Sequence, residues 1–357
     1  MKWARVIEAG APYGLAPLSG SSSDVGAVGY TLGGGLGPLG RRYGFAADHV
    51  RSIEVVTGDG RIRTATADDD PELFWALRGG KGSFGIVTAI EVDLMPVSHL
   101  YGGGIFYAGE HAAAVLHRWR TWVDTLPEET TSSIALLRAP DMPDVPEFLR
   151  GKLTVHLRVS HSGDVADGPA LVAPMREAAP VLADTLRPMS FREIDSIHLE
   201  PDHPVPAWET GMLLGSFPEQ AVEPLLAAAG PGADVPLILV ELRHLGGALA
   251  RPAAVPNAVA GRDAAFSVFV LGPAVPGLEE AVPAAAATVT DALAPYDAGS
   301  RLVNVLGHTS DPADVAAAWS PDVAARLIAL KHRYDPHALF TSGHALPVSP
   351  TDEHSLT

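Results

Sequence analysis

The backbone amide groups of a glycine-rich segment are the first candidates for ligand binding in this sequence. Residues 20–50 include glycine at positions 20, 26, 29, 33, 34, 35, 37, 40 and 44. Such a density indicates a backbone that approaches another backbone or a ligand closely. Apolar residues such as Val25, Tyr30 and Leu36 are interleaved with these glycines, and flexible linkers rarely contain them. The segment is therefore predicted to seat a flat or phosphorylated ligand, with its amides as anion donors.

A dinucleotide-binding turn is a second interpretation, because Gly35, Gly37 and Gly40 satisfy the G-x-G-x-x-G spacing. That turn lies between a strand and an amphipathic helix, with an acidic residue roughly 20 positions later. Here the sequence RRYGFAADHV follows without a helical apolar period, and residues 50–57 alternate like a strand. A Rossmann turn is therefore not expected.

Ionisable side chains gather at a second place, in the sequence VELRHL at 240–245. On a strand, Glu241 and Arg243 share one face and His244 points to the other. A catalytic base must reach the proton that leaves the substrate, and its pKa should lie near the working pH. These three residues are the candidates, and a solvated ion pair on a sheet face is the alternative for each.

The elements that position the glycines follow directly in the chain. Residues 50–57 and 61–66 alternate around Asp59-Gly60, the commonest two-residue hairpin signal. A helix is expected from Pro71, with Asp70 as its N-cap and Gly79-Gly80 after its end. Residues 84–94 are expected to form a buried strand that ends before Pro96.

From about residue 97 the pattern predicts alternating helices and strands. Apolar residues on one face predict a helix over about 111–125, and further helices are expected over 165–185, 218–229 and 278–294. Strands are expected over 153–160, 237–245, 265–272 and 301–307. A last helix is expected to start at Ser320-Pro321 and to end near Tyr334. This pattern favours an antiparallel sheet backed by helices.

Composition limits the possible functions. A chain of 357 residues that is 47% hydrophobic can bury one large core or two ordinary ones, and two lobes are expected. The net charge of −17 argues against a nucleic acid partner, because binding to phosphates depends on Lys and Arg. Without cysteine there is no disulfide and no thiolate metal site, so redox chemistry requires a bound cofactor.

The sequence lacks the patterns that predict membrane insertion, secretion or metal binding. No apolar run is long enough to cross a membrane, and MKWARVIEAG lacks the features of a signal peptide. A cytoplasmic protein without a membrane partner is expected. No H-E-x-x-H or clustered acidic motif predicts a metal site. The oligomeric state is left open by the sequence.

Five sequence blocks together resemble a known family. These are VGAVGYTLGGGLGPLGRRYGFAADHV, IEVVTGDG, PELFWALRGGKGSFGIVTAIEVDL, VELRHLGGALAR and RLIALKHRYDPHALF. In this order they are similar to the berberine-bridge-enzyme-like FAD-linked oxidases, which have the vanillyl-alcohol-oxidase or PCMH type of FAD-binding fold. The resemblance covers nearly the whole chain. It implies an α+β fold, with a partial FAD-binding lobe over 1–96, a substrate-binding domain over 97–300, and a C-terminal segment over 301–357 that returns to the FAD lobe.

The resemblance also assigns site residues. It implies that FAD contacts Ser22, Val25, Gly26, Gly29, Tyr30, Gly33, Gly34, Gly85, Ile86, Val87 and Asn304. For Gly85, Ile86 and Val87, ordinary sheet packing is an equal alternative. Because the strand at 240–245 lines the active site in the family, Glu241 and Arg243 are the preferred catalytic pair, with His244 behind them. Tyr30 is a third candidate, since it could reach the flavin ring from the cofactor side.

Two departures from the family bear on the cofactor. The cysteine that tethers flavin in many members aligns with Ser22, which cannot form a thioether. No counterpart of the N-terminal subdomain, with its tethering histidine and pyrophosphate loop, is found before Trp3. FAD is therefore expected to be non-covalent if it is bound. The aromatic residue that serves as a base in some plant members is replaced by Val305, and the tyrosine of the Y-x-N motif by Leu302.

Three functional hypotheses remain. The first is an FAD-dependent oxidase or dehydrogenase that acts on a small hydroxylated or natural-product substrate, with hydride transfer to flavin and reoxidation by oxygen. The second is a flavin-independent enzyme of natural-product biosynthesis that catalyses a redox-neutral cyclisation or isomerisation. The third is a non-catalytic binding protein. The retained glycines favour the first hypothesis, which is the one preferred.

Overall fold

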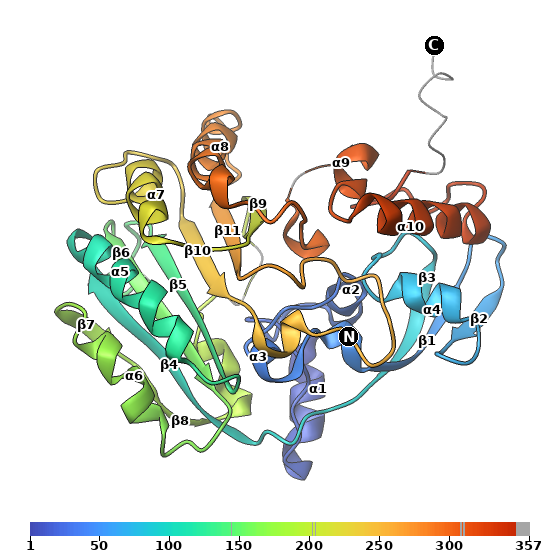
Figure 1. Cartoon of the computed structure of the whole chain (residues 1–357), viewed down its shortest axis with the longest axis horizontal. Coiled ribbons are helices and arrows are strands. Elements are labelled where there is room, and N and C mark those ends of the chain that lie inside the picture. Colours follow the sequence, from blue (N-terminus) through green and yellow to red (C-terminus); the bar gives the residue numbers. More distant parts are fainter. Residues whose placement is uncertain (144, 202, 204, 308, 310, 348–357) are drawn as a thin grey trace.

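Two lobes lie side by side in the computed structural model, which describes residues 1–347 except 144, 202, 204, 308 and 310 (Figure 1). The larger lobe is built on an eight-stranded sheet and the smaller on a three-stranded sheet. All pairs of named strands in the described ranges are antiparallel. The expected α+β class, with an antiparallel sheet backed by helices, is confirmed.

The smaller lobe contains the predicted hairpin. Strands β1 (Val50–Val56) and β2 (Ile62–Ala65) pair around a turn in which Gly60 has a φ of 77°. Strand β3 (Ile86–Val92) pairs with the other side of β1. Three helices complete the lobe: α4 (Pro71–Leu77), α9 (Pro312–Ala316) and α10 (Pro321–Tyr334). Thus the last helix, which is predicted correctly, packs against the lobe made by the first hundred residues.

Strand β3 differs from the expectation of a buried strand. Ile86 is 61% exposed, and most other residues of β3 are exposed or half-buried. The order of the small sheet is β2-β1-β3, so within the described residues β3 is an edge strand with one paired side. The apolar sequence of β3 predicted a strand correctly. Its exposure depends on the neighbours that the strand has in the fold.

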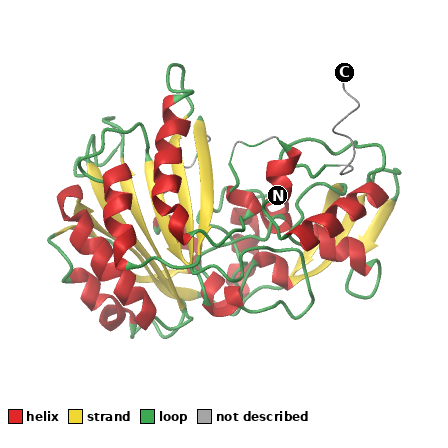
Figure 2. Ribbon diagram, turned by 45° about the horizontal axis from the view of Figure 1, so that its top comes forward, coloured by secondary structure: helices red, strands yellow, loops and turns green. Residues whose placement is uncertain are grey.

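The larger lobe has helices on one face of its sheet (Figure 2). Its strands are β4 (His99–Ala108), β5 (Thr130–Arg138), β6 (Leu153–His161), β7 (Val181–Asp184), β8 (Arg187–Ser190), β9 (Ala207–Leu214), β10 (Leu239–His244) and β11 (Phe266–Pro273). The order is β7-β4-β6-β5-β10-β11-β9, and β8 also pairs with β4. The covering helices are α5 (Ala112–Trp122), α6 (Gly168–Arg176), α7 (Val222–Ala229) and α8 (Ala281–Leu293). Trp119 and Trp122 lie in the core between them, as ordinary core residues.

Two predicted elements are wrong in this part of the chain. The helix expected over 165–185 ends at Arg176, and residues 181–184 form β7, which pairs with β4. The strand expected over 301–307 is instead a short 3₁₀ turn at Val303–Val305. Its central residue, Asn304, bonds through its side chain to the backbone of Tyr30. Residues 303–305 are thus held by a side-chain hydrogen bond to a distant segment and not by pairing with another strand. The sequence pattern contains no signal for such a long-range contact.

The glycine-rich segment lies between the lobes (Figure 1). It follows α1 (Trp3–Gly10) and contains the short helices α2 (Ala27–Leu32) and α3 (Gly40–Tyr43). Arg41 of α3 is buried and fastens the segment to the large sheet. Its guanidinium donates hydrogen bonds to the carbonyl oxygens of Thr130, Leu245 and Leu126.

No helix in the described part of the chain is both long and apolar enough to cross a bilayer.

Candidate active site

The face of the large sheet that carries no helices is polar. Leu157 and Leu242 point into the helix-covered core, so their neighbours on β6 and β10 point to the opposite face. Across the strands, Arg243 is paired with Ser133, and Ser133 with Arg158. The sheet therefore places side chains from β5, β6 and β10 in one row, although they are far apart in sequence.

Glu241 joins this row to a buried ion cluster. Its Oε1 lies 3.0 Å from Nη1 of Arg158, and its Oε2 lies 3.1 Å from Nη2 of Arg243. Nε2 of His198 lies 3.8 Å from the same Oε1. Burial alone would raise the pKa of Glu241, but Arg243 and Arg158 outweigh burial and hold this pKa below the usual carboxyl range. Glu241 is therefore ionised and a poor proton acceptor.

Two histidines beside the cluster are neutral. Burial lowers the pKa of His156 and of His198 well below the ordinary value, and the charge of Arg158 lowers both further. Nδ1 of His156 accepts a hydrogen bond of 3.1 Å from Nε of Arg158, and the ring stacks on Phe106. Nε2 of His156 and Nδ1 of His198 are buried and have no hydrogen-bond partner among the described residues.

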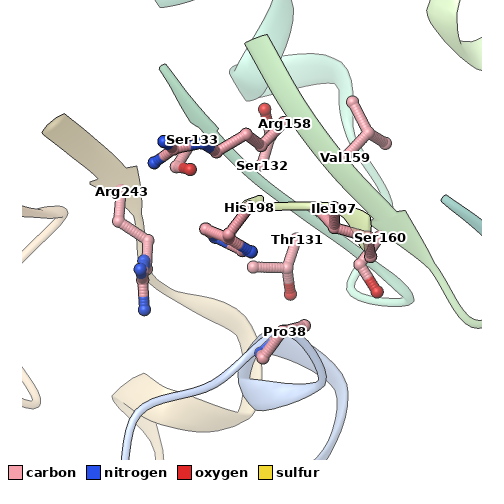
Figure 3. A pocket seen from close by; sticks show the side chains of 10 residues that line it. All are labelled: Pro38, Thr131, Ser132, Ser133, Arg158, Val159, Ser160, Ile197, His198 and Arg243. Carbon is pink, nitrogen blue, oxygen red and sulfur yellow. The ribbon is translucent and has the colours of Figure 1, made fainter. Parts of the chain in front are cut away.

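A small cavity opens at this cluster (Figure 3). Its volume of about 10 Å³ is close to the room that one water molecule needs. His198 and Thr131 project toward its middle, and Pro38 of the glycine-rich segment lies across from them. The site is thus formed where the glycine-rich segment meets the polar face of the sheet.

Tyr30 lies on the glycine side of this junction. Its hydroxyl is buried and has no hydrogen-bond partner among the described residues. Burial raises the pKa of Tyr30, and the charge of Arg243 acts in the opposite direction. A Cβ on Gly35 would lie 2.6 Å from the Tyr30 ring, and one on Gly37 would lie 2.9 Å from the hydroxyl. These two glycines allow the ring to lie directly on the backbone.

Asn304 connects the C-terminal segment to the same place. Its Nδ2 donates to the carbonyl oxygen of Tyr30 at 2.8 Å, and its Oδ1 accepts from Nζ of Lys81 at 2.9 Å. A Cβ on Gly33 would lie 2.1 Å from Oδ1 of Asn304, so only glycine leaves room for this contact. Burial lowers the pKa of Lys81 to about 8.

The remaining predicted cofactor residues fall into two groups. Gly34 and Gly85 pack against protein, since an added Cβ would meet Val259 at 3.2 Å and the carbonyl oxygen of Val56 at 2.5 Å. Gly26 and Gly29 are different, because an added Cβ at either one meets no atom within 4 Å.

Exposed apolar residues accompany the open glycines. Val25, next to Gly26, is 40% exposed, and Ile86 on β3 is 61% exposed. Val87 is half-buried, and so is Ser22, whose hydroxyl accepts a hydrogen bond from the amide of Asp24. A bare backbone beside apolar side chains fits the flat, partly apolar surface of a flavin nucleotide. The residues that fit FAD are thus those around Gly26 and Gly29.

His244 lies where strand alternation places it, on the other side of β10 from Glu241 and Arg243. Its Nε2 is 3.0 Å from Nη1 of Arg41, and its ring is tilted against Phe266. Burial lowers the pKa of His244 to about 3, and the charge of Arg41 contributes. His244 therefore supports the attachment of Arg41 rather than the cavity.

Sequence reasoning missed three members of the cluster: His156, Arg158 and His198. A signal was present for two of them, because LTVHLRVS alternates and places His156 and Arg158 on one strand face. His198 follows a 3₁₀ turn and has no such pattern. Within the described residues, no group of three His, Cys, Asp or Glu side chains is placed to hold a metal ion.

Several known proteins are similar in sequence to this chain. Residues 1–66 match a sequence model of an FAD binding domain. (R)-6-hydroxynicotine oxidase from Paenarthrobacter nicotinovorans is 26% identical over an alignment of 364 positions, gaps included, which covers 94% of this chain and 73% of that protein. The FAD-linked oxidoreductase YgaK from Bacillus subtilis strain 168 is 34% identical over an alignment of 127 positions, which covers 34% of this chain and 28% of that protein.

Solved structures share the fold over nearly the whole chain. The crystal structure of 6-hydroxy-D-nicotine oxidase from Arthrobacter nicotinovorans matches with a TM-score of 0.78 and 22% identity, covering 98% of this chain and 77% of that one. BBE-like 1 from Physcomitrella patens matches with a TM-score of 0.81 and 16% identity, covering 98% of this chain and 76% of that one. The chain thus contains an FAD binding domain over residues 1–66, and over nearly its whole length it shares the fold of 6-hydroxy-D-nicotine oxidase and of the berberine-bridge-enzyme-like protein.

Proposed function

We propose that the protein is an FAD-dependent oxidase or dehydrogenase that acts on a small hydroxylated substrate, with oxygen as the electron acceptor. One observation carries this proposal. The open backbone at Gly29, in α2, and at Gly26, the N-cap of α2, is close in sequence to Tyr30, whose buried hydroxyl is affected by the charge of Arg243 on the polar face of the sheet. A surface that suits the cofactor and a cluster that suits a polar substrate therefore meet at one residue.

FAD, when bound, would supply the acceptor for two electrons from the substrate. Val25, Gly26 and Gly29 would hold it from α2, and Ile86 and Val87 would contact it from β3. Asn304 would support this surface indirectly, through its bond to the backbone of Tyr30. Because the chain has no cysteine and Ser22 occupies the tether position, we infer that FAD is held without a thioether bond.

A proton must leave the substrate hydroxyl during such an oxidation. His198 is the best acceptor in the cluster, because it is neutral and its unpartnered Nδ1 lies on a ring that lines the cavity. Glu241 lies 3.8 Å from the opposite ring nitrogen and would stabilise the imidazolium that forms. Glu241 is thus proposed as a positioning residue, and Arg243 as a group that contacts the substrate.

A redox-neutral cyclase or isomerase is the second candidate. It is favoured by the position of Tyr30, whose ring and hydroxyl occupy the space directly above Gly35 and Gly37. On this alternative the Tyr30 hydroxyl and His198 would act on the substrate by acid–base chemistry alone.

The two candidates are separated by loading the purified protein with FAD. For the oxidoreductase we expect the visible flavin absorption to survive desalting and to bleach anaerobically with a small hydroxylated compound from a screening panel. Admission of oxygen should then restore the absorption. A Gly29→Val variant should lose the flavin, whereas Gly232→Val, at an open glycine in a distant loop, should retain it. Conversion of a compound by flavin-free protein, with no change in oxidation state, would establish the second candidate instead.

A further inference from the structure

The buried cluster carries more positive than negative charge. Arg158 and Arg243 both lie within salt-bridge distance of a single carboxylate, that of Glu241. The side chains of Arg158 and Glu241 are 6% and 5% exposed, and that of Arg243 is 16% exposed. Among the described residues, Arg243 has no second carboxylate at ion-pair distance, and the nearby Glu200 is exposed. The contacts therefore leave one guanidinium charge without a partner.

The neighbouring polar groups do not neutralise this charge. His156 and His198 are uncharged, because burial and the two arginines lower the pKa of each ring. The hydroxyls of Tyr30 and Ser160 are buried without a hydrogen-bond partner among the described residues. Hydroxyl and imidazole groups can donate hydrogen bonds to an anion but supply no negative charge of their own.

A buried charge is costly unless it is paired and hydrogen-bonded, and buried polar groups are normally satisfied. The site meets neither condition with protein atoms alone, and Ser160, His198 and Arg243 are among the residues that line the cavity in Figure 3. An anionic group that enters between Arg158, Arg243 and His198 would satisfy both conditions. The planar fork of a guanidinium matches the two oxygens of a carboxylate in particular.

We propose that the cavity between Arg158 and Arg243, which has room for about one water-sized atom, receives an oxygen of a carboxylate of the substrate and is thus a carboxylate subsite. Together with the proposed function, on which this part rests, the subsite identifies the substrate class as a hydroxylated carboxylic acid. Arg243 binds the carboxylate, and the substrate hydroxyl is left to face His198 and the cofactor surface. A neutral alcohol or an amine gains nothing from the second guanidinium.

Binding of simple carboxylates to the full chain tests the proposal without turnover. Isothermal titration calorimetry with acetate and 4-hydroxybenzoate is compared with acetamide and 4-hydroxybenzamide, which have similar shape and no charge. The carboxylates should bind about 10-fold tighter or more, as expected for charge-assisted hydrogen bonds, and the difference should shrink at high salt. Equal binding of acids and amides, or binding of neither, overturns the proposal.

Two substitutions in the cluster have opposite expected effects. Arg243→Met should weaken carboxylate binding about 10-fold or more, because it removes the unpaired charge. Glu241→Gln should strengthen carboxylate binding, because it removes the carboxylate that competes for both guanidinium groups. Arg243→Lys, which keeps the charge, should retain part of the affinity. A misfolded variant cannot bind more tightly. Tighter binding by Glu241→Gln would therefore be an effect of the removed charge and not of a damaged fold.

The matched control is Arg251→Met, which breaks an exposed ion pair with Glu128 and should leave carboxylate binding unchanged. Weakening by Glu241→Gln, or no effect of Arg243→Met, contradicts the subsite. Each titration is repeated with FAD-loaded protein. Carboxylate binding by a protein that takes up no FAD would refute the proposed oxidation and leave the subsite standing. Uptake of FAD without preference for carboxylates would refute the subsite and leave the proposed oxidation standing.

Discussion

At the scale of single residues, the site contains polar atoms that folding alone does not need. The hydroxyls of Tyr30 and Ser160 and one nitrogen each of His156 and His198 are buried without partners among the described residues. Burying such groups costs free energy, so their presence at the junction of the lobes indicates ligand binding rather than stability. Tyr107 differs from Tyr30, because its hydroxyl donates to the carbonyl oxygen of Met175 at 2.7 Å.

Tyr30→Phe should therefore stabilise the ligand-free protein or leave it unchanged. Removal of an unsatisfied buried hydroxyl is expected to raise the free energy of unfolding by up to about 1 kcal/mol. Tyr107→Phe is the matched control and should lower the free energy of unfolding by about 1 kcal/mol, since it breaks a buried hydrogen bond. Urea unfolding of both variants measures the difference. A large loss for Tyr30→Phe would mean that the hydroxyl has a structural partner.

The buried histidines predict how stability depends on pH. Burial lowers the folded-state pKa of His156, His198 and His244 below the unfolded value near 6.5. Below pH 6.5 the unfolded chain takes up protons that the folded chain does not, so stability falls as the pH is lowered. Each histidine contributes up to about 1.4 kcal/mol per pH unit. Glu241 adds nothing in this range, because its stabilising contribution is lost only at lower pH.

Unfolding measured between pH 7 and 5 should thus show a steep loss of stability. His244→Phe should reduce this slope, because burial lowers the pKa of His244 to about 3 and its titration is removed. His332→Gln, at an exposed position on α10, should leave the slope unchanged. The same slope in all three proteins would show that other groups govern the pH dependence.

At the scale of elements, the glycines of the central segment have two different purposes. Gly33, Gly35 and Gly37 let Asn304, Tyr30 and Ser19 approach the backbone, and they are required by packing. Gly26 and Gly29 face open space, and packing requires neither. Val28 of the same segment and Val87 of β3 pack against one core cluster, and β3 also lacks a cover within the described residues. Together they outline the surface proposed for the cofactor.

Gly29→Ala and Gly37→Ala should therefore behave in opposite ways. Gly29 lies within α2, so alanine should raise the free energy of unfolding by roughly 0.5–1 kcal/mol through its helix propensity. It should also weaken FAD binding. In Gly37→Ala the new Cβ would lie 1.9 Å from the carbonyl oxygen of Ser19, so we expect a loss of about 1–3 kcal/mol. Flavin titration and thermal unfolding measure both effects. Unchanged FAD affinity in Gly29→Ala would remove α2 from the proposed cofactor surface.

At the scale of the whole molecule, Arg41 is one of the residues that join the glycine-rich segment to the large lobe. It bonds to Leu126, to Thr130 at the start of β5, and to Leu245 after β10. These contacts hold the segment that carries the surface proposed for FAD against the sheet that carries the ion cluster. Binding of cofactor and substrate is therefore expected to depend on a residue that contacts neither of them.

Arg41→Met should lower the free energy of unfolding by about 2–4 kcal/mol, because several buried carbonyl oxygens lose their donor. It should also weaken the binding of 4-hydroxybenzoate, since Pro38 and Tyr30 are carried by the same segment. Arg5→Met, at an exposed position on α1, is the control and should change neither property. Intact carboxylate binding in Arg41→Met would show that the subsite is built by the sheet alone.

The sequence by itself determined the elements whose signals are local. Strand alternation gave β1, β6, β10 and β11, the Asp59-Gly60 turn gave the first hairpin, and Ser320-Pro321 gave the start of α10. Five sequence blocks in a fixed order predicted the FAD-binding fold that the solved neighbours share, because these blocks extend along nearly the whole chain. Alternation also placed Glu241 and Arg243 on one face, and their ion pair confirms this.

Only the tertiary structure decided which groups meet. Arg158 and Glu241 are 83 positions apart, and they come together because β5 lies between β6 and β10 in the sheet. The exposure of β3, the 3₁₀ turn at Asn304 and the neutral state of His198 likewise depend on neighbours that are distant in sequence. A local pattern reports what one segment can bury. Charge balance and unpaired polar atoms are properties of the assembled site.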